Sequence, residues 1–402
     1  MYQRFNRNNA GRAHSYGATR AKGRFGFKNR KSPSRGQYID PSKFINRAVI
    51  TEEVAKFVPE HKFSDFNIVE ELKKNIEKKG YVLPTPIQDK TIPHVLNGHD
   101  VVGIANTGTG KTAAFLIPLI NKVRKGKNEQ VLIIVPTREL ALQIDEELKV
   151  FARGMGIFSV CCVGGASIVP QIKALRYKNS FIVGTPGRLK DLIERKCIRL
   201  SEFGTLVLDE ADRMLDMGFV ADMRFIVLGM PKDKHTLFFS ATISSQVETL
   251  IKEFLREPIR IRVTTGETAR GVEQDVIKVG TGAAKLQALN DLLHNKEFNK
   301  VLVFGRTKHG VENLFRTLTE NGFRAESIHG NKSHRERQRA LGKFKDNQIQ
   351  ILVATDVAAR GLDIPDVSHV INFDLPATYD DYVHRIGRTG RGNKRGKALT
   401  FL

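Results

Sequence analysis

Short, uninterrupted apolar runs recur along the chain from about residue 60, and longer stretches of helical pattern separate them. The first set of runs comprises Val101–Ala105, Val131–Val135, Phe181–Val183, Thr205–Leu208 and Leu237–Phe239. The second set comprises Val301–Phe304, Ile351–Ala354 and Val367–Asn372. Strands without polar alternation are typical of parallel sheets that helices cover on both faces. The alternation of such strands with helices predicts an α/β fold with parallel sheets.

A polar segment at residues 264–273 separates the two sets of runs. It lacks apolar periodicity and contains two glycines, which is typical of a linker. We therefore predict two tandem domains, at residues 39–263 and 274–402. Two α/β domains on a flexible joint form a cleft that is able to close.

Residues 1–38 differ in composition from the rest of the chain. They hold ten basic residues, no Asp or Glu and no Leu, Val or Ile, and Gly, Asn and Ser separate single aromatic residues. Because such a segment cannot bury a core, we predict a disordered Arg/Gly/Asn-rich arm. Arginine with spaced aromatic rings suits loose binding of single-stranded nucleic acid through charge and stacking. The alternative is a solvated tail that only aids solubility.

The 402 residues carry a net charge of +22, of which +12 lies outside the arm. This excess predicts an acidic partner, either nucleic acid or an anionic membrane surface. No apolar run approaches the roughly 18 residues that span a bilayer, and no secretory signal follows the start, so we expect no membrane attachment. Cys161 and Cys162 lie in an apolar run that predicts a further strand. Together with Cys197 they lack zinc-ligand spacing, which indicates reduced thiols in a cytoplasmic protein.

A phosphate-binding pattern follows the first predicted strand. The segment Ala105-Asn-Thr-Gly-Thr-Gly-Lys-Thr112 opens a predicted helix and matches the P-loop, with alanine at the first glycine position. Its backbone N–H groups and the helix N-terminus favour phosphate, Lys111 neutralises the β- and γ-phosphates, and the Thr112 hydroxyl ligates Mg²⁺. The predicted cradle is Ala105, Asn106, Thr107, Gly108, Thr109, Gly110, Lys111 and Thr112.

An acidic run, Asp209-Glu-Ala-Asp212, stands directly after the apolar strand Thr205–Leu208. Parallel α/β sheets bind their ligands at this end of their strands. We expect Asp209 to hold Mg²⁺ through its hydration shell, and Glu210 to orient and deprotonate the attacking water. A surface acidic cluster would not explain why the run follows four apolar residues.

Two arginines of the second predicted domain, Arg388 and Arg391, lie in the stretch His384-Arg-Ile-Gly-Arg-Thr-Gly-Arg391. Hydrolysis spreads negative charge over the γ-phosphoryl oxygens, where a positioned arginine is worth roughly 10³–10⁵ in rate. If these arginines serve that role, ATP chemistry requires closure of the cleft. The alternative is a patch that binds RNA phosphates.

Together these motifs resemble the DEAD-box ATP-dependent RNA helicases of helicase superfamily 2, and the second-domain motifs are similar to those of bacterial members. The resemblance covers about residues 60–402 and implies two RecA-like P-loop domains. Gly80-Tyr-Val-Leu-Pro-Thr-Pro-Ile-Gln88 resembles the Q motif of the family, with Phe63 at the family's spacing. The resemblance implies that Gln88 reads the adenine edge, as an amide can through N6 and N7, and that Tyr81 stacks on the adenine face.

Further stretches resemble the family's RNA contacts. The implied RNA-binding residues are Pro136, Thr137, Arg138, Gly164, Gly165, Thr185, Pro186, Gly187 and Arg188 in the first domain, and Arg306, His334, Arg337, Thr355 and Asp356 in the second. Small donors and bidentate cations of this kind grip a nucleic-acid backbone without reading its sequence. The preference for RNA over DNA is implied by the family.

The resemblance also implies residues that couple the two ligands. Asp212, Ser240, Thr242 and His384 are the implied interdomain coupling residues. Gly361 and Asp363 are implied nucleotide contacts, with Asp363 near the ribose. ATP and RNA would then stabilise one closed conformer together.

Three features depart from the family pattern. His334 stands near where the family usually has Gln, which predicts an altered contact with RNA. Gly305-Arg306 replaces a more usual apolar–polar pair, and Arg306 is a candidate phosphate contact. The chain stops at Leu402, in what resembles the last strand of the second domain, so we expect that domain to be truncated at its C-terminal end.

The sequence therefore predicts an enzyme that couples RNA-stimulated hydrolysis of ATP, with Mg²⁺ as cofactor, to local unwinding of RNA duplexes or remodelling of RNA–protein complexes. The predicted catalytic residues are Lys111, Glu210, Arg388 and Arg391. One alternative is an ATP-gated RNA clamp with little turnover, against which these four intact residues argue. The other is a DNA translocase of the same superfamily, which the Gln88–Phe63 pairing disfavours. We expect a cytoplasmic, monomeric catalytic core, compatible with ribosome or RNA-decay assemblies.

Overall fold

The computed structural model describes most of the chain from residue 57 onward. The described residues are 44, 57–106, 108–126, 128–263, 272–280, 282–359, 364, 366–390 and 396–402, without the side chains of His334 and Asp380. The predicted arm and residues 264–271 of the predicted linker lie outside them. So do four predicted site residues, Thr107, Gly361, Asp363 and Arg391.

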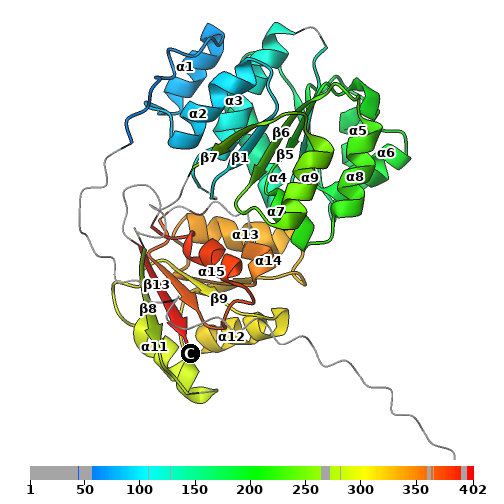
Figure 1. The fold of residues 1–402 in the computed structure, drawn as a ribbon. Helices are drawn as coiled ribbons and strands as arrows, with labels where there is room; N and C mark the ends of the chain where they lie inside the picture. Colours follow the sequence, from blue (N-terminus) through cyan, green and yellow to red (C-terminus); the bar gives the residue numbers. More distant parts are fainter. Residues whose placement is uncertain are drawn as a thin grey trace, which may run out of the picture. The chain divides into compact units, whose positions relative to one another are not determined.

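Strands and helices alternate within two α/β lobes, lobe one at residues 57–263 and lobe two at residues 272–402 (Figure 1). Lobe one contains α1 (Glu70–Lys78), α2 (Pro86–Leu96), β1 (Val101–Ile104), α3 (Lys111–Lys125), β2 (Val131–Ile134), α4 (Arg138–Phe151), β3 (Ser159–Cys162), α5 (Ile168–Leu175), β4 (Phe181–Gly184), α6 (Pro186–Glu194), η2 (Leu200–Glu202), β5 (Thr205–Leu208), α7 (Ala211–Asp216), α8 (Val220–Gly229), β6 (His235–Ser240), α9 (Ser245–Phe254) and β7 (Ile259–Arg262). Lobe two contains β8 (Val272–Ile277), α11 (Ala283–Leu293), β9 (Val301–Phe304), α12 (Lys308–Glu320), β10 (Ala325–Ile328), α13 (His334–Lys345), β11 (Ile351–Ala354), α14 (Asp356–Ala359), β12 (His369–Asn372), α15 (Tyr379–Ile386) and β13 (Gly396–Phe401).

Each lobe is built on one parallel sheet, as the apolar runs predict. The strand order is β3-β4-β2-β5-β6-β1-β7 in lobe one and β10-β11-β9-β12-β13-β8 in lobe two. The strand pairs of the described residues are parallel, for example β2 with β5 and β9 with β11. The prediction of two parallel α/β domains is confirmed.

The sequence pattern missed three strands, β7, β8 and β10, and each lies at the edge of its sheet. An edge strand in these lobes buries only one face, so its sequence lacks a continuous apolar run. β7 reads Ile-Arg-Ile-Arg, and β10 carries Glu326 and Ser327 between its apolar residues. The linker prediction was also too long, because Val272 and Glu273 belong to β8.

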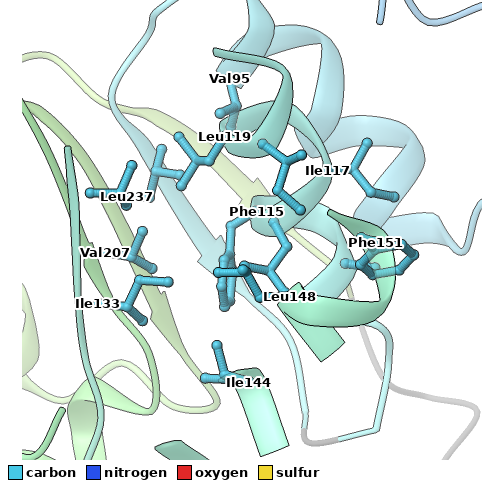
Figure 2. Close-up of a cluster of buried hydrophobic side chains, with 14 of the residues drawn as sticks. Val95, Phe115, Ile117, Leu119, Ile133, Ile144, Leu148, Phe151, Val207 and Leu237 are labelled. Carbon is cyan, nitrogen blue, oxygen red and sulfur yellow. The ribbon is translucent and has the colours of Figure 1, made fainter. Parts of the chain in front are cut away.

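The central strands of lobe one bury both of their faces. Val131 and Ile133 of β2 pack with α3 and α4, whereas Leu132 and Ile134 pack with the helices of the opposite face. Figure 2 shows Phe115 of α3 among side chains from the strands and from α4 in the first of these cores. Full burial of an aromatic side chain of this kind contributes about 1.5–3 kcal/mol.

Lobe two has a core on each face of its sheet, and one of its members comes from far away in the sequence. Phe44 is fully buried in the core that contains Leu302, Phe304 and Tyr382. The sequence prediction placed residue 44 in the first domain. In the structure, the Phe44 side chain instead packs in the core of lobe two.

The sequence predicts neither a membrane-spanning helix nor a zinc site, and both features can be examined in the described part of the chain. None of its helices combines the length and apolar character needed to cross a membrane. Its three cysteines are free thiols, and burial raises the pKa of Cys162 to about 12. The described residues contain no cluster of His, Cys, Asp and Glu that could hold a metal ion without further ligands.

Candidate active site

Neighbouring strands bring the predicted nucleotide motifs to one edge of the lobe-one sheet. The P-loop follows β1, the acidic run follows β5 and the Ser240–Thr242 segment ends β6, and these three strands are neighbours in the order β5-β6-β1. Because parallel strands end at the same edge, residues far apart in the sequence meet there.

The P-loop turns into α3 through two glycines in the left-handed region. Gly108 has φ of 86° and Gly110 has φ of 97°. A Cβ atom on Gly110 would also overlap the side-chain amide of Gln88, so this position requires glycine for two reasons. Within the loop, the Thr109 hydroxyl donates a hydrogen bond to the Asn106 carbonyl at 2.8 Å.

Lys111 places a buried ammonium group at the start of α3. The side chain is 5% exposed, and its Nζ atom has no hydrogen-bond partner among the described residues. The nearest carboxylate, Asp209, lies 4.0 Å away. A buried, unsatisfied ammonium is costly, so the site fits an anion such as a phosphate group that would accept its protons.

Asp209 ends β5 and is buried beside Lys111. Burial raises the pKa of Asp209 to about 6, although the Lys111 ammonium opposes this shift. Its Oδ1 atom also accepts a hydrogen bond from the Glu210 N–H at 2.9 Å. The Asp209 carboxylate and the Thr112 hydroxyl are the hard oxygen donors that Mg²⁺ prefers, so the residues present fit that ion.

Glu210 adopts a strained backbone conformation. Its φ of 52° and ψ of 48° lie in the left-handed region, which a residue other than glycine seldom occupies. Strain of this kind costs about 1–3 kcal/mol and clusters at functional sites. The side chain is buried, and its Oε2 atom lies 3.6 Å from Nε of Arg213.

A cavity of about 480 Å³ lies against these residues. Its lobe-one lining includes Tyr81, Gly108, Lys111, Thr112, Asp209 and Glu210. A larger cavity, of about 920 Å³, lies near the amino ends of β3 and β4, and none of the predicted site residues lines it. The smaller cavity is therefore the candidate nucleotide site on chemical grounds.

Gln88 connects α2 to the P-loop. Its Oε1 atom accepts a hydrogen bond from the Thr85 N–H at 2.9 Å, and its Nε2 atom donates to the Gly110 carbonyl at 3.1 Å. An amide oxygen accepts two hydrogen bonds and an amide nitrogen donates two, so the group retains capacity for adenine. Reading of adenine by Gln88 stays a prediction.

Tyr81 lies in an aromatic cluster next to this cavity. Its ring centroid is 5.9 Å from that of Phe63 and 5.6 Å from that of Phe151. Its hydroxyl donates to Glu147 at 3.1 Å, and Glu147 also pairs with Lys79 at 2.7 Å. Glu147 lies on α4 outside the sequence motifs, so no pattern in the sequence identified it.

Asp212 links the acidic run to the coupling segment. Its Oδ2 atom accepts hydrogen bonds from the N–H groups of Ala241 and Thr242, at 3.1 and 2.9 Å, and from the Thr242 hydroxyl. The Ser240 hydroxyl donates to the Thr242 carbonyl at 2.7 Å. The structure thus brings three predicted coupling residues together in lobe one.

The predicted RNA contacts of lobe one also meet at this edge. They follow β2, β3 and β4, which lie in the order β3-β4-β2 beside the nucleotide strands. The full set is Pro136, Thr137, Arg138, Gly164, Gly165, Thr185, Pro186, Gly187 and Arg188. Gly164 N–H donates to the Thr185 hydroxyl at 3.4 Å, and a Cβ on Gly165 would overlap the Arg138 guanidinium.

The predicted RNA contacts of lobe two lie after its strands and on its helices. Arg306 follows β9 with an exposed side chain, Thr355 follows β11, and Arg337 lies on α13. Asp356, however, is bound by Arg385 through two bonds, Nε to Oδ1 at 2.6 Å and Nη2 to Oδ2 at 2.8 Å. Asp356 therefore helps to position α15, and its role as an RNA contact stays a prediction. The side chain of His334 is outside the described atoms.

Arg385 was missed although it stands within the quoted 384–391 stretch. It is 1% exposed, and its Nη1 atom donates to the Asn372 side chain and to the Asp374 carbonyl. The predicted catalytic residue Arg388 follows one turn later and is also buried, with Nε donating to the His384 carbonyl at 3.3 Å. The roles of Arg388 and His384 stay predictions.

Two family models match the chain. Residues 85–250 match the family model described as DEAD/DEAH box helicase, and residues 284–393 match the one described as helicase conserved C-terminal domain. The chain belongs to the DEAD-box ATP-dependent RNA helicases.

Two bacterial relatives illustrate the sequence likeness. The chain is 46% identical to the ATP-dependent RNA helicase CshA of Listeria monocytogenes over 343 residues, which cover 85% of this chain and 66% of that protein. It is also 46% identical to the DEAD-box ATP-dependent RNA helicase CshA of Bacillus subtilis, over 85% of this chain and 69% of that one. The chain thus spans about two thirds of the length of these relatives.

Solved structures show the same fold. The Saccharomyces cerevisiae Dbp5 structure bound to RNA and ADP BeF3 has a TM-score of 0.77 and 30% identity, covering 85% of this chain and 89% of that one. Mss116p bound to ssRNA and AMP-PNP has a TM-score of 0.76 and 30% identity, over 83% of this chain and 72% of that one. Both are similar to this chain in fold.

Proposed function

We propose that this chain hydrolyses ATP in an RNA-stimulated reaction, and that hydrolysis drives local, largely sequence-independent unwinding of RNA duplexes or remodelling of RNA–protein complexes. One observation carries the proposal. The nucleotide residues follow β5, β6 and β1, the RNA residues follow β3, β4 and β2, and the six strands are contiguous in one sheet. Two ligands bound at one edge are therefore close enough to influence each other through shared loops.

The roles within the nucleotide site follow from burial and charge. Lys111 neutralises phosphate charge, because its buried ammonium needs an acceptor. Glu210 orients and deprotonates water, held by its strained backbone beside Asp209. Thr112 and Asp209 would hold Mg²⁺, which supplies charge neutralisation at the phosphate oxygens. Arg388 and Arg391 stabilise the charge that develops on the transferred phosphoryl group.

Asp212 and Thr242 carry the coupling between the ligands. Their hydrogen bonds connect the loop that holds Glu210 to the loop after β6, so a shift of one loop moves the other. Relatives support an RNA ligand, because the Dbp5 structure contains RNA with ADP BeF3 and the Mss116p structure contains ssRNA with AMP-PNP. We further propose a cytoplasmic, monomeric core that acts on RNA in ribosome or RNA-decay assemblies.

The decisive experiment is phosphate release by the purified chain with ATP and Mg²⁺, alone, with single-stranded RNA and with DNA of the same sequence. We expect stimulation by RNA and little by DNA. Equal stimulation by both would support a DNA translocase, and absence of turnover with retained ATP-dependent RNA binding would support the clamp. A fluorescent short RNA duplex, added in the same conditions, measures unwinding directly.

A further inference from the structure

Phe44 belongs to the core of lobe two although it precedes lobe one in the chain. Its side chain is completely buried. Its ring centroid lies 4.7 Å from that of Tyr382, at an interplanar angle of 66°. Edge-to-face pairs of this geometry are attractive beyond the area they bury. The contact is therefore a specific aromatic pair within a packed core.

Tyr382 in turn fixes the middle of α15. Its side chain is fully buried, and its hydroxyl donates a hydrogen bond to Oε1 of Gln274 on β8 at 2.9 Å. The ring also contacts Tyr379, one turn earlier on the same helix, at 5.8 Å between centroids. Phe44 and Gln274 thus hold Tyr382 by its ring and by its hydroxyl.

The same face of α15 carries a second anchor. Arg385 stands three residues after Tyr382, the spacing that places two side chains next to each other on a helix. Asp356 and the Asp374 carbonyl bind its guanidinium, which also lies 5.0 Å over the Phe304 ring. The helix is therefore held by an aromatic contact at Tyr382 and by an ion pair at Arg385. Arg388 follows directly.

We propose that Phe44 is a positioning residue for Arg388, which follows α15. Its ring completes the core beneath Tyr382 and so sets the helix from which Arg388 is presented. Without the ring, Tyr382 loses its edge-to-face partner, and the helix is oriented less firmly, by the Gln274 hydrogen bond and the Arg385 ion pair. This inference rests on the proposed role of Arg388 and Arg391 in ATP hydrolysis.

The position of Phe44 in the chain gives the contact a second consequence. In the sequence, Phe44 of the lobe-two core comes before the residues of lobe one. Residues 264–271 then connect lobe one to the rest of lobe two. The basic residues 1–38 end six residues before Phe44 in the sequence. Removal of residues 1–38 keeps Phe44 in the chain, so the effect of the basic segment can be measured separately from the effect of the Phe44 ring.

The test uses the full chain with Phe44→Ala, measured for phosphate release with saturating RNA. A misplacement of about 1 Å at a reacting group costs up to about 10²-fold in rate, so we expect kcat to fall roughly tenfold to a hundredfold. KM for ATP should change little, because the P-loop and Gln88 lie in lobe one. Phe44→Leu, which keeps most of the apolar volume, should restore most of the rate.

Two matched variants separate positioning from general stability. Leu318→Ala removes an equally buried side chain from the core on the other face of the lobe-two sheet, and deletion of residues 1–38 removes the arm alone. Both should retain kcat. Unchanged kcat in Phe44→Ala, or an equal loss in Leu318→Ala, would overturn the proposal.

Hydrogen exchange at the amides of α15 tests the packing without ATP. We expect faster exchange across Tyr379–Ile386 in Phe44→Ala than in the parent chain, and equal exchange would refute the contact. An inactive parent chain would count against the proposed function only, because the exchange measurement then still decides whether Phe44 holds α15.

Discussion

The Oδ2 atom of Asp212 accepts hydrogen bonds from both the backbone N–H and the hydroxyl of Thr242, at 2.9 and 3.0 Å. Asp212 lies in the first turn of α7, two residues after Glu210, and Thr242 lies just after β6. Because Asp212 is buried, these bonds compete little with water, and bonds to a charged group contribute about 1.5–3 kcal/mol each. The contact is therefore strong enough to make the two loops move together.

Asp212→Ala should uncouple ATP hydrolysis from RNA. The change leaves three donors without their acceptor, so we expect the RNA-stimulated rate to fall toward the rate without RNA. Lobe one should lose at least about 3 kcal/mol of stability, because each unsatisfied donor costs about 1–3 kcal/mol. Thr242→Val removes the hydroxyl bond alone and should have a smaller effect. Phosphate release and urea unfolding measure the two quantities. Asp233→Ala, at an exposed carboxylate in the turn before β6, is the control, and full RNA stimulation in Asp212→Ala would contradict the coupling role.

Glu210→Gln should abolish turnover while ATP and RNA still bind. The substitution keeps the shape of the side chain and removes the proton acceptor, which is worth about 10²–10⁴ in rate. Single-turnover hydrolysis gives the rate, and fluorescent nucleotide and RNA titrations give the affinities. Glu202→Gln, at a half-exposed carboxylate on η2, serves as the matched control. Turnover near the parent rate would show that Glu210 is not the base.

Lobe two should lose stability in acid through Glu312. Burial of Glu312 opposes its ionisation, but hydrogen bonds from His329 and Ser327 and the Lys332 ammonium outweigh it and lower the pKa of Glu312 to about 2. A carboxyl whose pKa is depressed in the folded state stabilises the protein fully above its ordinary value near 4.5. That contribution is lost as the pH falls from about 4.5 toward 2.

Glu312→Gln should therefore cost about 1–2 kcal/mol at pH 7 and flatten the acid limb of the stability profile. Urea unfolding followed by circular dichroism at several pH values measures the effect. Glu320→Gln, at the exposed end of the same helix, should leave the profile unchanged. An identical acid limb in Glu312→Gln and the parent would contradict the assignment.

Deletion of residues 1–38 should weaken RNA binding and reduce its dependence on salt. Each phosphate contact to a single strand contributes about 0.7 to the slope of log K against log salt, so the ten basic residues can account for up to about 7 units. RNA affinity measured between 50 and 300 mM salt, roughly the range in which counterion release dominates, gives the slope. RNA-stimulated ATPase activity at saturating RNA should persist. An unchanged slope would favour the solubility role.

The sequence predicted best those features that a continuous segment encodes. The P-loop needs a strand, two glycines and a helix start within a few residues, and Gly108, Gly110 and Lys111 supply them in order. The central strands are buried on both faces, so Val131–Ile134 and Thr205–Leu208 are apolar throughout and recognisable. Asp209 and Glu210 were likewise predicted at the end of a strand, because they directly follow one of these apolar runs.

Contacts between distant segments were decided by the tertiary structure alone. The edge strands β7, β8 and β10 were not predicted from the sequence, because a strand that buries only one face has no continuous apolar run. Asp356 is a predicted RNA contact, and only the structure shows that Arg385, on another helix, binds its carboxylate. Phe44 reads as a lone aromatic before lobe one, and only the packed core shows that it belongs beneath Tyr382. A local sequence pattern is set by residues that are neighbours along the chain. These pairings instead depend on which distant segments the whole fold brings into contact.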